Sequence, residues 1–248
     1  MTERPTLEVQ RVRHEVKRRS LQVRKVTRLA PRMVRVTLGG DDMEDFVSAS
    51  FDDHVKVFFP ASTPDAEPAK RDFTPRRYDN ARRELEIEFV LHGEGPATEW
   101  AAAAQVGDAL EIGGPRGSFV IPVEFDHHVL LGDESALPAI ARRLEELAGR
   151  ARVTALVEVD GDADRVALPQ GEGLAVHWIS RQQGSLLDAV RALPLPAGET
   201  YYWAAGESAA VRAIHQHLVH ERGVDKKRIR ASSYWRRGAV AVHETFEE

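Results

Sequence analysis

The spacing of apolar and polar residues along this chain changes near residue 125. Before that point, short runs alternate apolar with polar residues, as strands with one buried face do. These runs cover residues 21–26, 33–38, 54–59, 85–91, 109–112 and 119–122. A short helix through the alanines at 101–104 interrupts them. The pattern predicts an antiparallel β-barrel over residues 21–124, preceded by a solvated basic arm over residues 1–20.

Beyond residue 125, continuous apolar runs alternate with helical segments. Strand-like runs occupy residues 128–132, 152–159, 174–179 and 200–205. One predicted helix ends near Gly149, and two more cover residues 185–193 and 208–222. Apolar strands that alternate with helices are typical of a parallel sheet covered on both faces. We therefore expect an α/β domain over residues 125–248.

Composition and charge exclude several classes of function. The net charge is −5, from 34 basic and 39 acidic residues, which argues against a nucleic-acid partner. The chain has no cysteine, which excludes disulfides, Cys-ligated metal centres and thiol nucleophiles. His215 and His217 point to different faces of a predicted helix, so no metal site is expected. The apolar runs are too short to span a membrane and none resembles a signal sequence, so we expect a cytoplasmic protein.

Two stretches of the barrel region have residues suited to an anionic cofactor. Arg71–Asp79 gathers three arginines, a threonine hydroxyl and two aromatic rings, which suit a large, flat, anionic group. An ordinary basic loop between two strands explains the same residues. Residues 92–100 combine glycines with Thr98, which can cap a helix whose N-terminus would hold a pyrophosphate. A simple strand-to-helix turn is the alternative.

In the α/β region, polar residues follow the predicted strands. Gly132–Pro138 follows the first strand, where open α/β sheets bind ligands, but it lacks the dinucleotide glycine pattern. Its acidic pair would repel a pyrophosphate placed directly on it. Ser180 and Arg181 follow the third strand and suit the 2′-phosphate of NADPH, although a plain loop is equally consistent. Residues 233–238 combine aromatic rings with two cations, or form a terminal strand with surface charges.

A rival function comes from Gly206–Ala210, which departs by one residue from the nucleophile elbow of serine hydrolases. Ser208 would be the nucleophile, and Asp225 with His243 would complete a triad. Ala210 replaces the second glycine of the motif, and Ser208 as the N-cap of the following helix is the favoured interpretation.

Taken in order, these stretches resemble the siderophore-interacting protein family, the NAD(P)H-dependent ferric-siderophore reductases. The matching segments are 54–60, 71–76, 92–100, 114–118, 132–138, 205–207 and 234–238. The resemblance runs from about residue 18 onward and implies a ferredoxin reductase-like fold, with an FAD-binding barrel followed by an NAD(P)H-binding domain. It implies an enzyme of iron acquisition that passes electrons through FAD to a ferric siderophore and releases Fe(II). A quinone, free flavin or an electron-transfer protein as acceptor is the alternative.

The resemblance also implies binding residues and no catalytic acid–base group or resident metal. Those for FAD are Arg71, Phe73, Thr74, Arg76, His92, Gly95, Ala97, Thr98 and Trp100. Those for NAD(P)H are Asp133, Glu134, Ser135, Ala136, Ser180, Arg181, Gly206, Glu207, Trp235 and Arg236. Lys56 and Arg116 would contact the ferric siderophore. Phe73 stands where the family has tyrosine. The phenylalanine ring can still stack on the flavin, but the hydrogen bond of the tyrosine hydroxyl is lost. Arg181 favours NADPH over NADH, and a monomer is expected.

Overall fold

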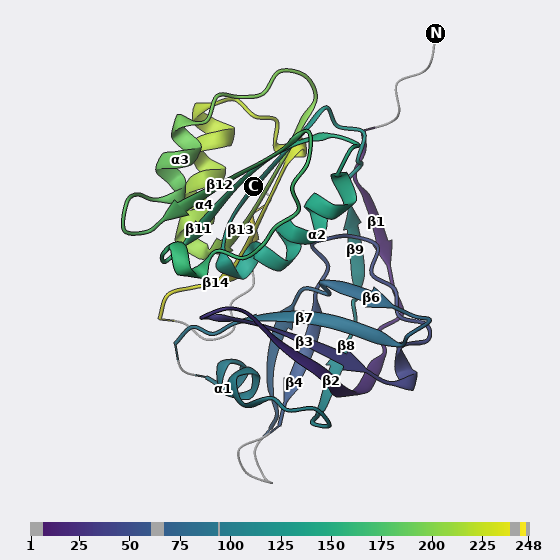
Figure 1. Ribbon diagram of the computed structural model, residues 1–248. Coiled ribbons are helices and arrows are strands. Elements are labelled where there is room, and N and C mark those ends of the chain that lie inside the picture. The colour runs from purple at the N-terminus through teal and green to yellow at the C-terminus, as the bar shows by residue number, and fades with distance from the viewer. Residues whose placement is uncertain (1–6, 61–66, 94, 239–243, 247–248) are drawn as a thin grey trace. The chain divides into compact units, whose positions relative to one another are not determined.

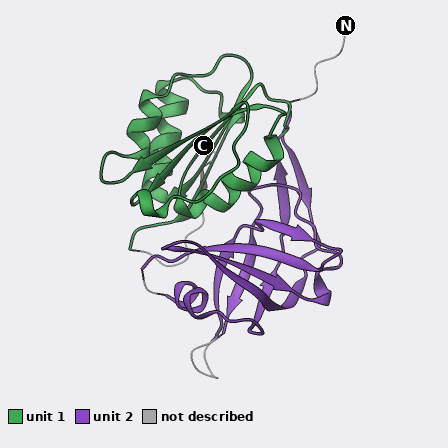
Figure 2. Cartoon of the chain, viewed as in Figure 1, with its two compact units in different colours: residues 1–7, 122–248 green, residues 8–121 purple. Residues whose placement is uncertain are grey.

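The computed structural model divides the chain into two compact units (Figure 2). Unit 2 comprises residues 8–121, and unit 1 comprises residues 1–7 together with 122–248. The structure describes residues 7–60, 67–93, 95–238 and 244–246. The division falls after Ile121, close to the expected boundary at residue 124.

Unit 2 is built on a seven-stranded antiparallel sheet in the order β5-β4-β8-β2-β3-β7-β6 (Figure 1). Its strands are β2 (Arg18–Ala30), β3 (Met33–Gly39), β4 (Val55–Phe59), β5 (Ala69–Phe73), β6 (Arg77–Asp79), β7 (Glu84–Val90) and β8 (Ala109–Gly113). A separate two-stranded ribbon pairs β1 (Gln10–Arg13) with β9 (Gly117–Val120), and α1 (Pro96–Ala103) follows β7.

The alternating sequence pattern explains the core of unit 2. In β4, Val55, Val57 and Phe59 are buried while Lys56 between them is exposed. The inward side chains of neighbouring strands, such as Ile87, join them in one apolar cluster. Period-two alternation places every second side chain on the same face, so each strand contributes one row to this core. The prediction of an antiparallel barrel-type domain is confirmed.

Three strands of unit 2 differ from the sequence expectation. Residues 1–20 were expected to form a solvated arm, but β1 lies within them and pairs with β9 in antiparallel register. The stretch 71–79 was expected to be a loop, but β5 and β6 occupy much of it and form the two edges of the large sheet. All three strands consist mostly of polar residues with exposed or half-exposed side chains. Their order therefore comes from backbone pairing rather than from an apolar face.

Unit 1 is built on a six-stranded sheet in the order β12-β11-β10-β13-β14-β15. Its strands are β10 (His127–Asp133), β11 (Arg152–Val159), β12 (Leu174–Ser180), β13 (Thr200–Glu207), β14 (Ile229–Trp235) and β15 (Glu244–Phe246). The first five run parallel, and β15 pairs antiparallel with β14. Its helices are α2 (Leu137–Leu147), α3 (Leu186–Ala192) and α4 (Ser208–Gln216), which continues as a π-helix over His217–Glu221.

The helices cover both faces of this sheet, as the sequence predicts. Helices α3 and α4 lie on one face and α2 lies on the other (Figure 1). The central residues of β10 are apolar on both faces of the sheet. Val129 and Leu131 pack toward α3 and α4, while Leu130 between them faces the opposite side. Within the described residues, no helix has both the length and the apolar character needed to cross a membrane.

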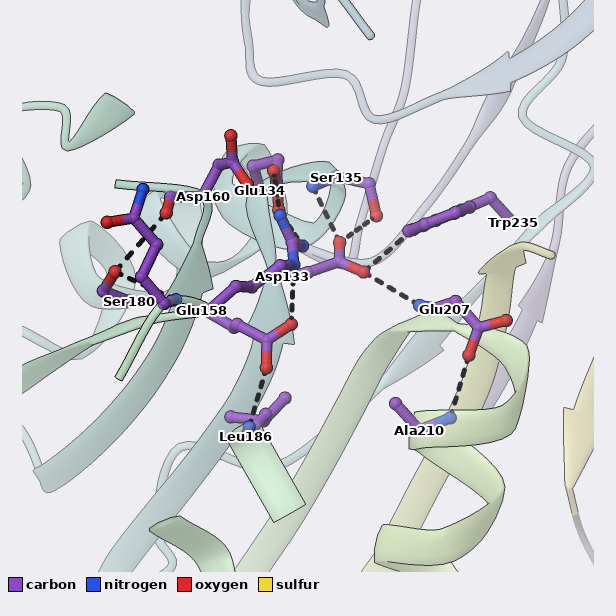
Figure 3. A network of polar contacts seen from close by, with 12 residues as sticks. Asp133, Glu134, Ser135, Glu158, Asp160, Ser180, Leu186, Glu207, Ala210 and Trp235 are labelled. Carbon is purple, nitrogen blue, oxygen red and sulfur yellow. Dashed lines mark hydrogen bonds and ion pairs between the residues drawn. The ribbon is translucent and has the colours of Figure 1, made fainter. Parts of the chain in front are cut away.

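A buried carboxylate fixes the carboxyl ends of three neighbouring strands. Asp133, the last residue of β10, is 4% exposed. Its Oδ1 accepts hydrogen bonds from the backbone N and Oγ of Ser135, at 2.9 and 2.5 Å. Its Oδ2 accepts from the backbone N of Glu207 in β13 at 2.9 Å and from Trp235 Nε1 in β14 at 2.8 Å (Figure 3). Burial raises the pKa of Asp133, and the hydrogen bonds from Ser135 and Trp235 act against that rise.

A second buried titratable group, His128, lies earlier in β10. Its side chain is 1% exposed, and its ring centroid lies 5.8 Å from that of Phe125. Burial, with the nearby charge of Arg143, lowers the pKa of His128 to about 3. The imidazole is therefore neutral in the folded protein at neutral pH, and protonation favours the unfolded chain.

We predict that Asp133→Asn destabilises unit 1. An amide presents one accepting oxygen, so its NH2 group would face donors that now bind the carboxylate. Leaving buried donors without acceptors costs about 1–3 kcal/mol in the free energy of unfolding. Urea denaturation followed by tryptophan fluorescence measures this loss. Asp162→Asn, which removes one partner of the exposed ion pair with Arg165, is the control and should leave the midpoint nearly unchanged. Equal midpoints for the two variants would contradict the assignment.

We also predict that His128 makes the protein less stable in mild acid. The folded pKa of about 3 lies below the ordinary value of 6.5, so the contribution is complete above pH 6.5 and falls as the pH drops toward 3. Below pH 6.5 the loss approaches about 1.4 kcal/mol per pH unit. His128→Phe, with a ring of similar size, should show a shallower fall in unfolding free energy from pH 7 to pH 5. His177→Phe, an exposed position on β12, should follow the wild-type curve.

Candidate functional site

The residues expected to bind FAD all lie in unit 2, several of them on or next to β5. Arg71 is half-buried in β5, and its Nη1 donates a hydrogen bond to the backbone oxygen of Lys70 at 2.7 Å. Among the described residues this is its one side-chain hydrogen bond, so other guanidinium donors can serve an anionic ligand. Thr74, immediately after β5, is 7% exposed.

The aromatic residues of this region pack together rather than standing alone. Phe73 is half-buried, with its ring centroid 4.5 Å from that of Phe89 and 6.0 Å from that of Phe59. Trp100 of α1 lies 5.6 Å from Phe89 and 5.9 Å from Phe59. The cluster joins β5 to α1 and provides aromatic surface beside Arg71. With phenylalanine in place of the family's tyrosine at position 73, the ring still packs on the core.

The N-terminus of α1 differs in detail from the expectation. Thr98 was expected to cap this helix, but Gly95 is the N-cap and Pro96 opens the helix. Thr98 lies in the first turn, where its Oγ1 donates to the backbone oxygen of His92 at 3.2 Å. Gly95 has a φ of 147°, and a Cβ there would meet nothing within 4 Å. Glycine adopts a positive φ without strain, which suits Gly95 to this position, and Thr98 falls inside the helix that follows. Ala97, also expected to contact FAD, lies in the same first turn.

Arg76 occupies a different environment from the other basic residues of this stretch. Its side chain is 4% exposed, and its Nε lies 3.6 Å from Glu88 Oε1. The same carboxylate accepts from Arg35 Nε at 2.9 Å. Arg76 therefore contributes to a buried ion cluster inside unit 2, and its proposed contact with FAD remains a prediction.

The two residues expected to contact the ferric siderophore lie near one end of β4 and β8. Lys56 pairs in register with Gly113, the last residue of β8, and Arg116 follows in the turn to β9. Both side chains are exposed. Lys56 Nζ lies 2.6 Å from Asp72 Oδ1, which offsets part of its positive charge. These two cations have the exposure that contact with an anionic complex requires.

The residues expected to bind NAD(P)H lie at the carboxyl edge of the parallel sheet in unit 1. Asp133 ends β10, Ser180 ends β12, Glu207 ends β13 and Trp235 ends β14. From β10 the chain adds β11 and then β12 on one side, and it then returns to add β13 and β14 on the other side of β10. The strand order therefore reverses between β10 and β13, which is the topological switch point. This is where open parallel sheets bind nucleotides.

Several of these residues already have partners within the protein. Asp133, Ser135 and Trp235 form the network described above, and Ala136 is fully buried beneath them. The Glu207 carboxylate accepts from the backbone N of Ala209 and Ala210, at 2.7 and 3.0 Å. Ser180 Oγ accepts from the backbone N of Gln182 at 3.3 Å. Arg236 is exposed at the end of β14. Polar side chains of this edge therefore support the loops that surround the switch point.

A glycine permits the close approach of two strand ends. Gly206 in β13 has a φ of 146°, and a Cβ there would lie 2.6 Å from Asp133 Oδ2. Any side chain at this position would displace the carboxylate from its donors. The role of Gly206 in this structure is to admit Asp133, and its contact with the nucleotide remains a prediction.

Arg181 is held by two carboxylates. Its Nη1 lies 2.6 Å from Glu134 Oε1, its Nη2 also bonds Glu134, and its Nε lies 2.9 Å from Glu158 Oε1. The hydrogen bond and charge of Glu134, with the charge of Glu158, raise the pKa of Arg181. The assignment of Arg181 to a 2′-phosphate remains a prediction, and the structure adds two acidic residues to its surroundings.

Sequence reasoning missed Glu158. This residue lies near the carboxyl end of β11. The neighbouring strands β10 and β12 lead into the two loops that the sequence analysis identified. Its Oε2 accepts from the backbone N of Leu186, the first residue of α3, at 2.7 Å. Applying the strand-end rule to the second parallel strand would have found it.

The structure gives Ser208 a structural role. It was expected to cap α4, but Glu207 is the N-cap and Ser208 is the first helical residue, 3% exposed. A buried serine at this position is poorly placed to attack a substrate. His243, the third member of the alternative triad, lies outside the described residues. Within the part of the chain that the structure describes, no cluster of His, Cys, Asp or Glu could hold a metal ion.

Comparison with known proteins places both units. The siderophore-interacting protein family matches residues 125–238, and the siderophore-interacting FAD-binding domain matches residues 22–66 and 61–119. The NADPH-dependent ferric-chelate reductase of Escherichia coli (strain K12) is 36% identical over 247 residues, with 91% of this chain and 96% of that protein covered. The ferric vibriobactin reductase ViuB of Vibrio cholerae is 34% identical over 237 residues, with 86% and 88% covered.

Solved structures agree with this result. A siderophore utilization protein from T. fusca is 40% identical, with a TM-score of 0.88 over 95% of this chain and 98% of that chain. The ferredoxin–NADP⁺ reductase of Plasmodium falciparum, 12% identical with a TM-score of 0.70 over 87% and 95% of the two chains, shares the fold. The predicted ferredoxin reductase-like architecture is confirmed. The chain belongs to the siderophore-interacting protein family.

Proposed function

We propose that this protein is a flavin-dependent ferric-siderophore reductase that takes electrons from NAD(P)H. The observation that carries the proposal is the FAD-binding domain match over unit 2, in a chain whose relatives over most of its length include ferric reductases. The parallel sheet of unit 1, with its switch point between β10 and β13, supplies the complementary nucleotide-binding fold.

The residues of unit 2 fit a flavin dinucleotide. Arg71 has guanidinium donors beyond its bond to Lys70, which suits phosphate or ring oxygens. Half-buried Phe73 and Trp100 provide apolar aromatic surface beside it. No side chain caps the described N-terminus of α1, whose backbone N–H groups suit a pyrophosphate. We assign Arg71, Phe73, Thr74 and the start of α1 to FAD.

Unit 1 fits a nicotinamide dinucleotide at the edge formed by the ends of β10, β13 and β14. The Asp133 network holds these three ends together, and Gly206 lets the backbone approach closely. Trp235 is half-buried there and is oriented through its Nε1, so its ring is fixed before any ligand binds. A rigid edge of this kind orients a bound dinucleotide at low entropic cost.

The residues assigned to FAD would hold a group whose chemistry allows two-electron acceptance from the nicotinamide and one-electron transfer to Fe(III). Each NAD(P)H oxidised therefore reduces two ferric complexes. Siderophores bind Fe(III) through hard anionic oxygens, which suit Fe(II) less well, so reduction loosens the iron. The protein needs neither iron ligands nor an acid–base residue for this transfer. Exposed Lys56 and Arg116 are proposed to attract the anionic complex despite the negative net charge.

We propose further that the enzyme acts as a monomer in the cytoplasm, where NAD(P)H is present. Each unit buries an apolar cluster of its own, which supports a fold that is stable without a partner subunit. Size-exclusion chromatography with light scattering tests the oligomeric state, and a dimer at micromolar concentration would contradict this part of the proposal.

The proposed reaction is tested by the visible absorbance of the purified protein under anaerobic conditions. A flavin spectrum should bleach on addition of NADPH or NADH and recover on addition of a ferric catecholate. If NAD(P)H reduces the flavin but the ferric complex does not reoxidise it, the proposed cofactors stand and the proposed ferric-siderophore acceptor is wrong. A protein that neither contains nor takes up FAD would overturn the proposal.

We predict that Arg71→Ala purifies with much less FAD than the wild type. The substitution removes the charged donors proposed to hold the flavin, which should weaken FAD binding by about tenfold or more. Flavin absorbance per protein, before and after incubation with FAD, measures this loss. Arg82→Ala, an exposed arginine of the turn after β6 with a long ion pair to Asp79, is the matched control. Normal flavin content in Arg71→Ala would remove Arg71 from the site.

A further inference from the structure

Arg181 has its charged edge occupied before any nucleotide arrives. Glu134 bonds both terminal nitrogens of the guanidinium, in the paired geometry that a phosphate would use. Glu158 bonds the remaining nitrogen, Nε, at 2.9 Å. A 2′-phosphate can make the same two-pronged contact only where Glu134 now binds.

The two carboxylates are fixed to different degrees. Glu158 uses its second oxygen to accept from the backbone N of Leu186 at the start of α3 (Figure 3). Glu134 lies in the turn after β10, and the described hydrogen bonds of its carboxylate go to Arg181. Moving Glu158 would break a helix contact, whereas moving Glu134 breaks only its contact with Arg181. Glu134 is therefore the partner that a phosphate could displace.

Charge makes this displacement costly. The side chains of Glu134 and Glu158 are each 16% exposed and that of Arg181 is 28% exposed, so solvent screens the three charges only in part. Two carboxylates surround one guanidinium, which leaves this cluster with excess negative charge. A 2′-phosphate would add further negative charge, while the 2′-hydroxyl of NADH would add none.

We propose that Glu134 competes with the 2′-phosphate of NADPH for Arg181 and so sets the preference between NADPH and NADH. This inference rests on the proposed function, because it requires a dinucleotide at the carboxyl edge of unit 1. With the contact closed, the site takes a nucleotide that carries a hydroxyl at the 2′ position. NADPH binds in this arrangement at the expense of the bond between Glu134 and Arg181.

The test compares the binding of 2′,5′-ADP and 5′-AMP to the full-length, FAD-containing protein by isothermal titration calorimetry. Glu134→Gln keeps one accepting oxygen and removes the competing charge. It should shift the ratio of the two dissociation constants toward 2′,5′-ADP by about tenfold. Glu134→Ala, which also removes the oxygen, should shift it in the same direction. The ratio of the Michaelis constants for NADPH and NADH should shift in the same direction, in favour of NADPH.

Two further variants serve as controls. Glu146→Gln removes a carboxylate from another arginine pair of unit 1, with Arg142 and Arg143, and should leave the ratio unchanged. Arg181→Ala should weaken 2′,5′-ADP far more than 5′-AMP. Adding Glu134→Gln to Arg181→Ala should then produce little further shift, because the two side chains act through the same contact.

An unchanged ratio in both Glu134 variants, with both nucleotides bound and the flavin reduced by NAD(P)H, would overturn this inference alone. An equal gain for both nucleotides would also overturn it, because Glu134 would then not act on the group at the 2′ position. A wild type that binds neither nucleotide, and whose flavin neither NADH nor NADPH bleaches, would overturn the proposed function together with the inference.

Discussion

The carboxylate of Asp133 is the interaction on which the arrangement of unit 1 depends. Parallel strands end in separate loops, and the backbone ladder alone does not hold those loops in a common geometry. Asp133 joins the ends of β10, β13 and β14 through donors from Ser135, Glu207 and Trp235. Burying a carboxylate is costly, and these donors together offset that cost. The positions of Glu134 and Glu207, and of the strand ends around the switch point, follow from this one anchor.

Much of the fold could be predicted because most strands have a clear apolar pattern. The alternation in β4 and the continuous apolar run of β10 each indicate how many faces are buried. Strands β1, β5 and β6 could not be found in this way. Their side chains are mostly charged and half-exposed or exposed, and their backbone groups pair with β9, β4 and β7. Such pairing depends on partners distant in sequence, which a local pattern does not reveal.

The candidate site could be predicted to the level of segments but not of contacts. The rule that ligands bind beyond the carboxyl ends of parallel strands identified the loops after β10 and β12. It could not show that Arg181 bonds Glu134, 47 positions earlier, or that Trp235 bonds Asp133, 102 positions earlier. Arg76 likewise turns inward to Glu88. Long-range ion pairs decide which charged residues of a motif face a ligand, and they arise only once the sheet has formed.

Two adjacent residues at the carboxyl end of β10 have separate roles. Asp133 is bound to the scaffold through two other strands, whereas the Glu134 carboxylate contacts one arginine. Substitutions at position 133 therefore endanger the fold, while those at position 134 alter only a local charge. With the role proposed here for Glu134, evolution can change the electron donor through the second position without first acquiring compensating stability. Descendants of one ancestral reductase can thus diverge in the nucleotide pool on which they draw while keeping the same sheet.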